Sequence, residues 1–218
     1  MKTVLMTGGS SGIGKAIKEK LHEEGYIVFN IGRHEADIVC DLRDGETLER
    51  VVKAWLKEYD VHVLINCAGI GLFDPHETIS PAKIKNLIDV NLTAPIILSS
   101  LCLRALQKTG GHIINITSVE ATRHAKYSAL YTATKSGLRD FGFCLFEEVR
   151  KSGVKVTSIN PDITQTPFFD ALHFAPSDDE QTYLLPQTIA QSVLDVLHVN
   201  GAITDITIRP QKVGIAKK

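Results

Sequence analysis

Residues 3–14 of the chain read TVLMTGGSSGIG. The β-rich run Thr3–Thr7 predicts a strand, and the pattern Gly14–Glu24 after the glycines predicts a helix. Glycines in such a turn let backbone N–H groups approach a pyrophosphate, and the helix N-terminus supplies positive partial charge. A glycine-rich turn alone is most often just a turn, but the strand before it and the helix after it favour a dinucleotide-binding site.

The rest of the chain continues this alternation of short apolar runs and helical patterns. The predicted strands are Thr3–Thr7, Tyr26–Ile31, Ile38–Cys40, Val61–Asn66, His112–Thr117, Val154–Asn160 and Ile203–Ile208. The predicted helices are Gly14–Glu24, Thr47–Tyr59, Pro81–Leu106, Ala129–Lys151 and Thr188–Val199. Strands that alternate with helices imply crossover units and a parallel sheet. A length of 218 residues suits one α/β domain, residues 1–218.

Composition excludes several classes of function. The hydrophobic fraction is 44% and the formal net charge is -1, so nothing indicates a nucleic-acid or anionic-membrane partner. The four cysteines show no C-x-x-C spacing, which indicates a reducing compartment without disulfides or a metal site. The apolar runs look too short to cross a bilayer, and a cleaved leader would remove the first strand. We therefore expect a cytoplasmic protein.

The end of the second predicted strand bears on cofactor choice. NAD-selective sites usually place an acid there for the ribose 2′-OH, whereas an arginine suits a 2′-phosphate. Here the strand ends at Gly32-Arg33, which favours NADP(H) over NAD(H). Arg33 could instead be a solvated loop residue, and Asp37 keeps the NAD(H) alternative open.

A second pattern combines Tyr131, Lys135 and Ser118. Tyr131 and Lys135 stand four residues apart on a predicted helix and so share one face. A positive charge nearby lowers the pKa of a phenol from about 10. Ser118, thirteen residues before the tyrosine, could hold a carbonyl oxygen within reach of it. The set suits acid/base chemistry between a carbonyl and an alcohol, although such a spacing often marks only a solvated helix face.

Taken together, these motifs resemble the short-chain dehydrogenase/reductase (SDR) family over nearly the whole chain. The cofactor turn T-G-x-x-x-G-x-G is matched by residues 7–14, and the catalytic Y-x-x-x-K signature by residues 131–135. Between them lie Asp41-Leu42, the N-[AN]-A-G segment at residues 66–69, the helical Asn91 and Ser118 in the family's order.

The resemblance implies a Rossmann-type, doubly wound sheet of seven mostly parallel strands with helices on both faces. It implies a cofactor site made by Gly8, Ser10, Ser11, Gly12, Ile13, Gly14, Arg33, Asp41, Leu42, Asn66, Ala68, Gly69, Tyr131, Lys135, Pro161, Thr164 and Thr166. It also implies four catalytic residues. Tyr131 would exchange the proton, and Lys135 would lower the pKa of Tyr131 and bind the nicotinamide ribose. Ser118 would polarise the carbonyl, and Asn91 would hold a water near Lys135.

The function expected from this resemblance is an NADP(H)-dependent oxidoreductase that transfers hydride between nicotinamide and a small carbonyl or secondary alcohol. The substrate is left open, and residues 164–186 are the expected substrate loop, with Phe168 and Phe169 as candidate pocket walls. The alternative is a non-catalytic NADP(H)-binding sensor or interaction protein on the same fold. Relatives pair through their two long helices, so a homodimer or homotetramer is expected.

Two departures from the family pattern fall near the expected active site. Asp162 stands where the family usually has glycine in N-P-G. Glu120 stands shortly after Ser118, where a small residue is usual. Neither removes a catalytic group, but both bear on which substrate fits.

Overall fold

The computed structural model describes all 218 residues and contains a seven-stranded sheet in the order β3-β2-β1-β4-β5-β6-β8. The strands are β1 (Thr3–Thr7), β2 (Ile27–Gly32), β3 (Ile38–Val39), β4 (Val63–Asn66), β5 (His112–Ile116), β6 (Lys155–Pro161) and β8 (Asp205–Ile208). Every neighbouring pair in this sheet is parallel. The predicted α/β doubly wound fold is therefore confirmed.

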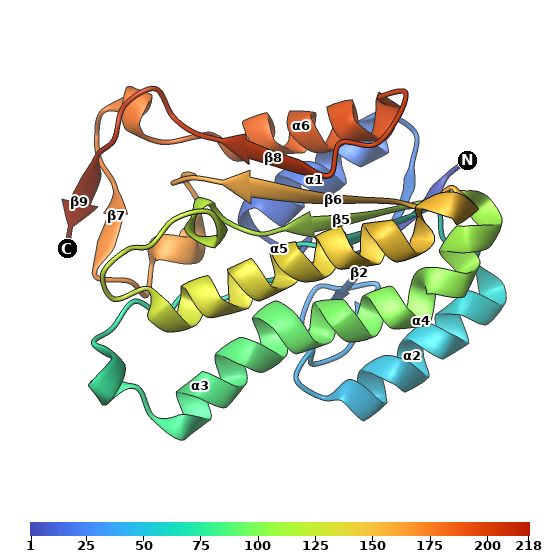
Figure 1. Ribbon diagram of the computed structural model, residues 1–218, viewed down its shortest axis with the longest axis horizontal. Helices are drawn as coiled ribbons and strands as arrows, with labels where there is room; N and C mark the ends of the chain where they lie inside the picture. Colours follow the sequence, from blue (N-terminus) through green and yellow to red (C-terminus); the bar gives the residue numbers. More distant parts are fainter.

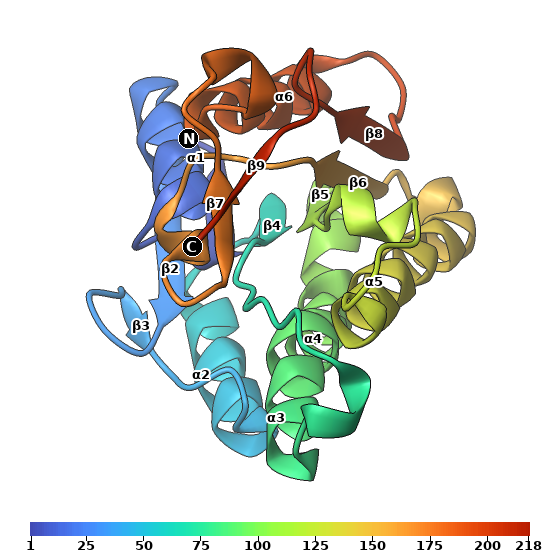
Figure 2. The same cartoon turned by 90° about the vertical axis from the view of Figure 1, so that its left-hand side faces the viewer.

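The chain has six α-helices (Figure 1). They are α1 (Gly12–Glu23), α2 (Gly45–Glu58), α3 (Pro81–Ile88), α4 (Ala94–Thr109), α5 (Ala129–Val149) and α6 (Pro186–His198). All but α3 pack on the two faces of the sheet. Figure 2 shows α1 and α6 on one side of the sheet and α2, α4 and α5 on the other. Because side chains alternate along a strand, Val4 and Met6 pack into the first layer and Leu5 packs into the second. Strands buried on both faces need no polar alternation, which explains the continuous apolar runs.

The order of the strands creates a crevice at one edge of the sheet. From β1 the chain moves outward to β2 and β3, and then returns to place β4 on the other side of β1. Ligands of open parallel sheets bind outside the carboxyl ends of the strands at such a reversal. The strands point toward the end of the molecule that carries two further short strands, β7 and β9 (Figure 1).

The long helix predicted at Pro81–Leu106 is divided in the structure. A π-helical segment, η2 (Asp89–Thr93), separates α3 from α4. Pro95 has no N–H and cannot donate to the carbonyl of Asn91, four residues earlier. A local change of helical spacing is a common response, and π segments often occur at functional sites. Asn91 therefore lies in the irregular turn of this helical run.

The same helical run corrects one expectation. Pro81–Thr109, 29 residues, is long and apolar enough to cross a membrane by length and composition. In the fold its α4 part contributes Leu98, Cys102 and Leu106 to the core against the sheet. A core helix passes the same test of length and composition, so this run carries no argument for a membrane.

The segment between β6 and α6, expected to be irregular, contains short ordered elements. They are η5 (Pro167–Phe169), β7 (Phe174–Pro176) and η6 (Glu180–Thr182). β7 pairs antiparallel with β9 (Ile215–Lys217) near the C-terminus, as Figure 2 shows. Strands of three residues are too short to show a period of two, so the sequence did not predict this pair.

Candidate active site

A cavity of about 1110 Å³ opens at the carboxyl ends of the strands. It is larger than the roughly 300–1,000 Å³ of ordinary small-molecule pockets. The predicted site residues that line it are Gly8, Ser10, Ser11, Gly12, Ile13, Gly14, Arg33, Asp41, Leu42, Ala68, Gly69, Ser118, Tyr131, Lys135, Pro161, Thr164 and Thr166. Asn66 and Asn91 do not line it. The structure thus brings residues from seven separate segments of the chain to one place.

The glycine turn is packed so closely that side chains cannot enter it. A Cβ on Gly14 would lie 2.0 Å from the carbonyl oxygen of Gly8, and Gly8 itself has φ +75°. A Cβ on Gly8 would lie 2.8 Å from Cα of Ala68, in the segment after β4. The Gly9 N–H donates to Oδ1 of Asn30 in β2 at 2.7 Å, a support that the sequence did not reveal. The turn is therefore fixed against both strands that flank β1.

The N-terminus of α1 faces this cavity without a cap. Its N-cap, Ser11, is extended and makes no side-chain cap hydrogen bond, and the first turn contains no acidic residue. The first N–H groups of a helix have no partner within the helix and carry positive partial charge. Uncapped donors beside a turn that excludes side chains fit the phosphates of a dinucleotide. The residues present therefore suit the cofactor that the sequence predicts.

The end of β2 carries the groups that discriminate between the two cofactors. Gly32 and Arg33 both line the cavity, and Arg33 forms no ion pair within 4.0 Å. The carboxylate of Asp37, which kept NAD(H) open, accepts hydrogen bonds from the Asn30 N–H at 2.8 Å and from Lys18 at 3.4 Å. Asp37 does not line the cavity. Asp37 is therefore not placed to bind the ribose of a cofactor in this cavity.

Arg43 is a cavity residue that the sequence analysis missed. Its Nε donates to Oδ1 of Asp41 at 2.9 Å, and its Nη1 donates to Asn86 at 3.3 Å. The Arg43 guanidinium lowers the pKa of the Asp41 carboxyl to about 2. The two charges balance each other, which leaves Arg33 as the cation without a carboxylate partner in this corner. The D-x-R spacing at residues 41–43 was the available signal.

Tyr131 lies at the other end of the cavity, one helical turn before Lys135 on α5. The tyrosine is 6% exposed, and burial raises the pKa of its phenol above the usual value. A hydrogen bond with the Ser118 hydroxyl lowers the pKa of Tyr131 by a smaller amount, and the negative charge of Glu120 raises it further. The expected net lowering of the Tyr131 pKa is therefore wrong for the chain by itself. At neutral pH the phenol is a proton donor.

The Lys135 ammonium is held close to the phenol by the sheet. Its Nζ donates to the carbonyl oxygen of Ile116 at 3.0 Å and lies 5.9 Å from the centroid of the Tyr131 ring. Burial lowers the pKa of Lys135 to about 8. Desolvation disfavours the charged form of both groups, which shifts the two pKa values in opposite directions.

The two predicted asparagines that do not line the cavity have structural contacts instead. Asn91 accepts from the N–H of Ile70 and donates to its carbonyl, both at 2.9 Å. Asn91 Oδ1 and Lys135 Nζ approach the same point, 3.6 and 3.2 Å from the position of a Cβ on Gly69. Asn66 donates to Oδ1 of Asn115 on β5 at 2.8 Å and is buried in the sheet.

The two departures from the family pattern, Glu120 and Asp162, both line the cavity and meet at Arg123. Arg123 donates to Glu120 at 2.7 Å, and its Nη2 lies 3.8 Å from Asp162 Oδ1. Glu120 also accepts from Ser128 at 2.8 Å, and Asp162 accepts from Arg209 at 2.9 Å. This charge cluster ties the segment after β5 to the ends of β6 and β8.

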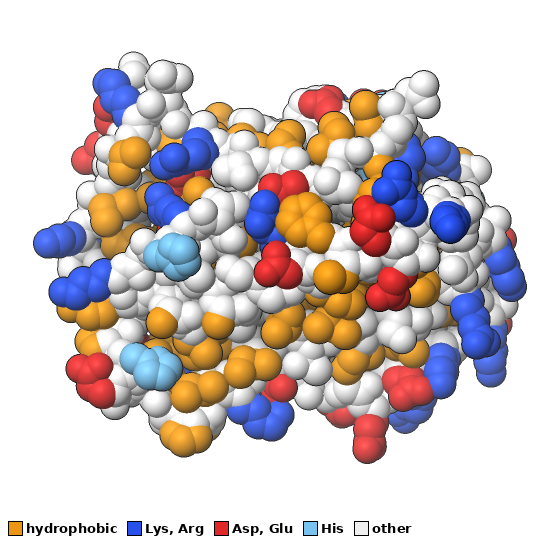
Figure 3. Space-filling view, viewed as in Figure 1, with side chains coloured by type: hydrophobic (Ala, Val, Ile, Leu, Met, Phe, Trp, Pro, Cys, Tyr) orange, Lys and Arg blue, Asp and Glu red, His pale blue; other side chains and the backbone are white.

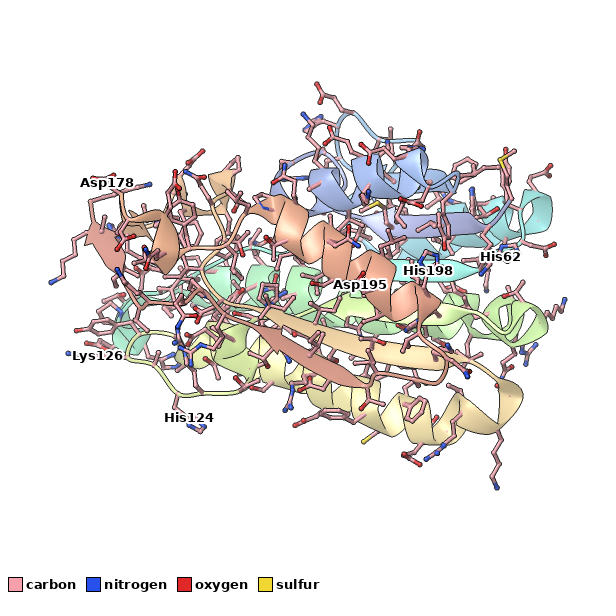
Figure 4. All side chains as sticks on the ribbon, turned by 90° about the horizontal axis from the view of Figure 1, so that it is seen from above. His62, His124, Lys126, Asp178, Asp195 and His198 are labelled. Atoms are coloured by element: carbon pink, nitrogen blue, oxygen red, sulfur yellow. The ribbon has the colours of Figure 1, made fainter.

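Phe168 and Phe169, the two candidate pocket walls, line the cavity, and so do Phe73 and Phe174, which the sequence did not indicate. Lys126, another lining residue, lies at the same end of the molecule as Asp178, whereas His62 and His198 lie toward the other end (Figure 4). One cavity thus contains both the predicted cofactor-binding residues and the aromatic ones.

The sequence of this chain is similar to those of known oxidoreductases. The sequence model of the short chain dehydrogenase family matches residues 2–175. The chain belongs to the short-chain dehydrogenase family. An uncharacterised oxidoreductase of Staphylococcus epidermidis is 31% identical to it over 96% of this chain and 97% of its own length. One from Staphylococcus aureus is 32% identical with the same coverage. The chain is accordingly an oxidoreductase of this family.

Solved structures of short-chain dehydrogenases superpose closely on this one. An alcohol dehydrogenase from the archaeon Thermococcus sibiricus, complexed with 5-hydroxy-NADP, has a TM-score of 0.87 and 25% identity, and the match covers 98% of this chain and 99% of that one. A metagenomic short-chain oxidoreductase in complex with NADP has a TM-score of 0.80 and 28% identity over 96% of each chain.

The packing of the glycine turn yields a test. We expect Gly14→Ala to lower the free energy of unfolding by about 1–3 kcal/mol, because its Cβ has no space beside Gly8. We also expect weaker NADPH binding, measured by fluorescence titration. The matched control is Gly137→Ala on α5, whose Cβ would meet only Leu92 methyl groups at 3.5 Å. Equal NADPH affinities in the two variants would contradict the role given to the turn.

Proposed function

We propose that this short-chain dehydrogenase is an NADP(H)-dependent carbonyl reductase or alcohol dehydrogenase. The observation that carries the proposal is the position of Ser118, Tyr131 and Lys135 in the same cavity as the uncapped N-terminus of α1. A cofactor bound along the glycine turn and a substrate carbonyl beside Tyr131 would then share one enclosed space.

The cofactor-binding residues have separate tasks in this proposal. The turn Gly8–Gly14 and the α1 N-terminus would hold the pyrophosphate, and Asp41 and Leu42 would border the adenine. Pro161, Thr164 and Thr166 would border the carboxamide; Thr166 lies close to the turn, with its Cβ 3.1 Å from the position of a Cβ on Gly12. The nicotinamide, when bound, would give a hydride in reduction and accept one in oxidation, while the chain supplies orientation and proton transfer.

Tyr131 is the proposed general acid in carbonyl reduction. Its buried phenol is protonated at neutral pH, because burial raises its pKa. Ser118 would accept no proton but would donate a hydrogen bond to the carbonyl oxygen and so hold it beside the phenol. After the proton leaves, the Lys135 ammonium 5.9 Å from the ring centroid stabilises the phenolate. In alcohol oxidation the same phenolate would accept the proton.

Lys135 and Asn91 are the proposed route for the replacement proton. Both side chains approach Gly69, and a water held there would connect the ammonium to the solvent side of the cavity. Asn91 lies in the π-helical turn η2 and also fixes the backbone of Ile70. It is a positioning residue for Lys135 in this scheme.

A preference for NADPH is proposed from the charges at the end of β2. Arg33 has no carboxylate partner, whereas Arg43 is neutralised by Asp41. Asp37 is engaged by Asn30 and Lys18. A 2′-phosphate would give Arg33 a charge-assisted hydrogen bond, which a 2′-hydroxyl cannot match. Solved neighbours have been complexed with NADP as well as with NADH, so the proposed preference rests on the charges at the end of β2.

A non-catalytic NADP(H) sensor is the less favoured alternative, because all four expected catalytic residues are present. We further propose that the protein is a cytoplasmic homodimer or homotetramer. Its four cysteines are free, as a reducing compartment requires. Apolar side chains lie among charged ones over α4 and α5, the helices through which relatives are expected to pair (Figure 3). Sedimentation velocity tests the assembly.

The first test of function is Tyr131→Phe. We expect kcat of this variant to be lower than that of the wild type by a factor of about 10²–10⁴, because phenylalanine retains the ring but cannot donate a proton. NADPH affinity, measured by fluorescence titration, is expected to change little. A variant with the wild-type kcat on any carbonyl that the wild type reduces would refute the assignment.

Arg33→Ala tests cofactor choice. We expect the ratio of kcat/KM for NADPH to that for NADH to fall by about 10- to 100-fold, since a hydrogen bond to a charged group is worth about 1.5–3 kcal/mol. Arg50→Ala is the control, because Arg50 lies on α2 outside the cavity and the one side-chain hydrogen bond of its guanidinium is from Nη2 to Thr47 at 3.4 Å. A wild-type preference for NADH would overturn the NADP assignment.

The pH dependence of kcat/KM for NADPH tests Lys135. The cofactor-free chain keeps this ammonium charged below its pKa of about 8 and loses the charge as the pH rises through that value. We therefore expect kcat/KM for reduction to fall by about tenfold per pH unit above pH 8. In Lys135→Arg, whose residual activity is measured in the same way, this decrease should disappear because arginine stays charged.

A further inference from the structure

The substrate end of the cavity is surrounded by aromatic rings from three separate segments. Phe73, after β4, lies with its ring centroid 4.9 Å from that of Tyr131 and 5.1 Å from that of Phe174 on β7. Phe168 on η5 lies 6.1 Å from Tyr131. Phe169 connects the set, at 5.3 Å from Phe168 and 5.6 Å from Phe174. The rings form a closed set of contacts next to the proposed acid.

These four phenylalanines, which we call the phenylalanine wall, present apolar surface to the cavity. All four line it, and only Phe169 is fully buried, at 8% exposure. A half-buried aromatic cluster inside a cavity is typical of a binding site for an apolar group. Gly71 maintains the close approach, since a Cβ there would lie 2.6 Å from Cζ of Phe168.

The charged groups near the wall already have partners within the chain. Glu120 and Asp162 are paired with Arg123 and Arg209. Asp74 lies 3.9 Å from His173 and 4.0 Å from Lys83. The acidic side chains that line this end of the cavity, Glu120, Asp162 and Asp74, thus each lie within 4.0 Å of a basic side chain of the same chain.

The cations that remain are at the solvent-exposed edge. Lys218 donates to the carbonyl oxygen of Phe169 at 2.6 Å. Lys126 and Lys217 are exposed, where an ion pair is worth only about 0–1 kcal/mol. A polyhydroxylated or doubly charged substrate would lose its hydration against the rings without recovering it. The wall therefore suits an apolar group better than a strongly hydrated one.

Resting on the proposed function, we propose that the substrate is an apolar carbonyl compound, an aryl or branched-alkyl ketone or aldehyde, whose hydrocarbon part packs against Phe73, Phe168 and Phe174. Its carbonyl oxygen would lie at Ser118 and Tyr131. We expect sugars, hydroxy acids and amino acids to be poor substrates.

The C-terminal strand holds the outer side of this wall. β9 pairs with β7, so that Phe174 lies opposite Lys217 in the register. Lys218 is hydrogen-bonded to η5 through Phe169, and its N–H donates to the carbonyl oxygen of His173 at 3.0 Å. Residues 215–218 are thus positioning residues for two of the four rings.

The experiment compares kcat/KM for matched carbonyl compounds with NADPH. Benzaldehyde and acetophenone form the apolar group; glyceraldehyde and pyruvate form the polar group. We expect the apolar group to exceed the polar group by at least about tenfold, the smaller end of the discrimination that a hydrophobic pocket gives. Phe168→Ala should raise KM for the apolar compounds by about tenfold or more. It should change KM for the polar compounds by no more than about twofold.

Two further variants complete the design. Tyr59→Ala removes an aromatic ring that packs with Phe29 and Trp55 outside the cavity. This variant should leave kcat/KM unchanged for both the apolar and the polar compounds. Phe168→Leu retains apolar volume. If thermal melting shows that Phe168→Ala is unfolded, Phe168→Leu is used to test whether Phe168 packs against the substrate. It should lower kcat/KM for the aryl compounds more than for a branched-alkyl ketone.

The outcomes separate the two proposals. Higher kcat/KM for the polar group, or unchanged KM for the apolar group in a folded Phe168 variant, overturns the apolar substrate class and leaves the oxidoreductase function standing. No NADPH consumption with either group, in protein that binds NADPH, overturns the proposed function and this inference together.

Discussion

The structure depends on the contact between Gly14 and the carbonyl of Gly8. This contact requires the helix α1 to begin immediately beside β1, and it lets the turn lie against the segment after β4. The same closeness leaves the first N–H groups of α1 facing the cavity without a side-chain cap. One steric constraint therefore fixes the position of the helix, the path of the chain at the sheet reversal and the site for an anion.

Burial has opposite effects on the two ionisable groups at the other end of the cavity. It raises the pKa of Tyr131, which keeps the phenol protonated, and it lowers the pKa of Lys135 to about 8. The chain thus holds a neutral acid next to an ammonium that is close to losing its proton. This arrangement suits a proton donor for carbonyl reduction better than a base that is already ionised.

The sequence predicted the parts of the site that depend on local spacing. The glycine turn needs only neighbouring residues, and Tyr131 with Lys135 needs only one helical turn, so both were visible as patterns. The parallel sheet followed from the alternation of apolar runs with helices, and its carboxyl ends brought these patterns together. Asn66 and Asn91 carry the family motif, but their contacts to Asn115 and Ile70 depend on tertiary structure.

What the sequence did not predict depends on pairs that are distant along the chain or too short to show a period. β7 and β9 are three residues each and lie about forty residues apart, and a propensity argument has no signal for such a pair. Phe73 and Phe174 look like ordinary core residues until the fold places them on the same cavity. In the sequence, Glu120 and Asp162 were only departures from the family pattern, whereas in the structure both lie within 4.0 Å of Arg123. The features at the substrate end of the cavity are thus the long-range ones, which is why the sequence indicates the chemistry more readily than the substrate.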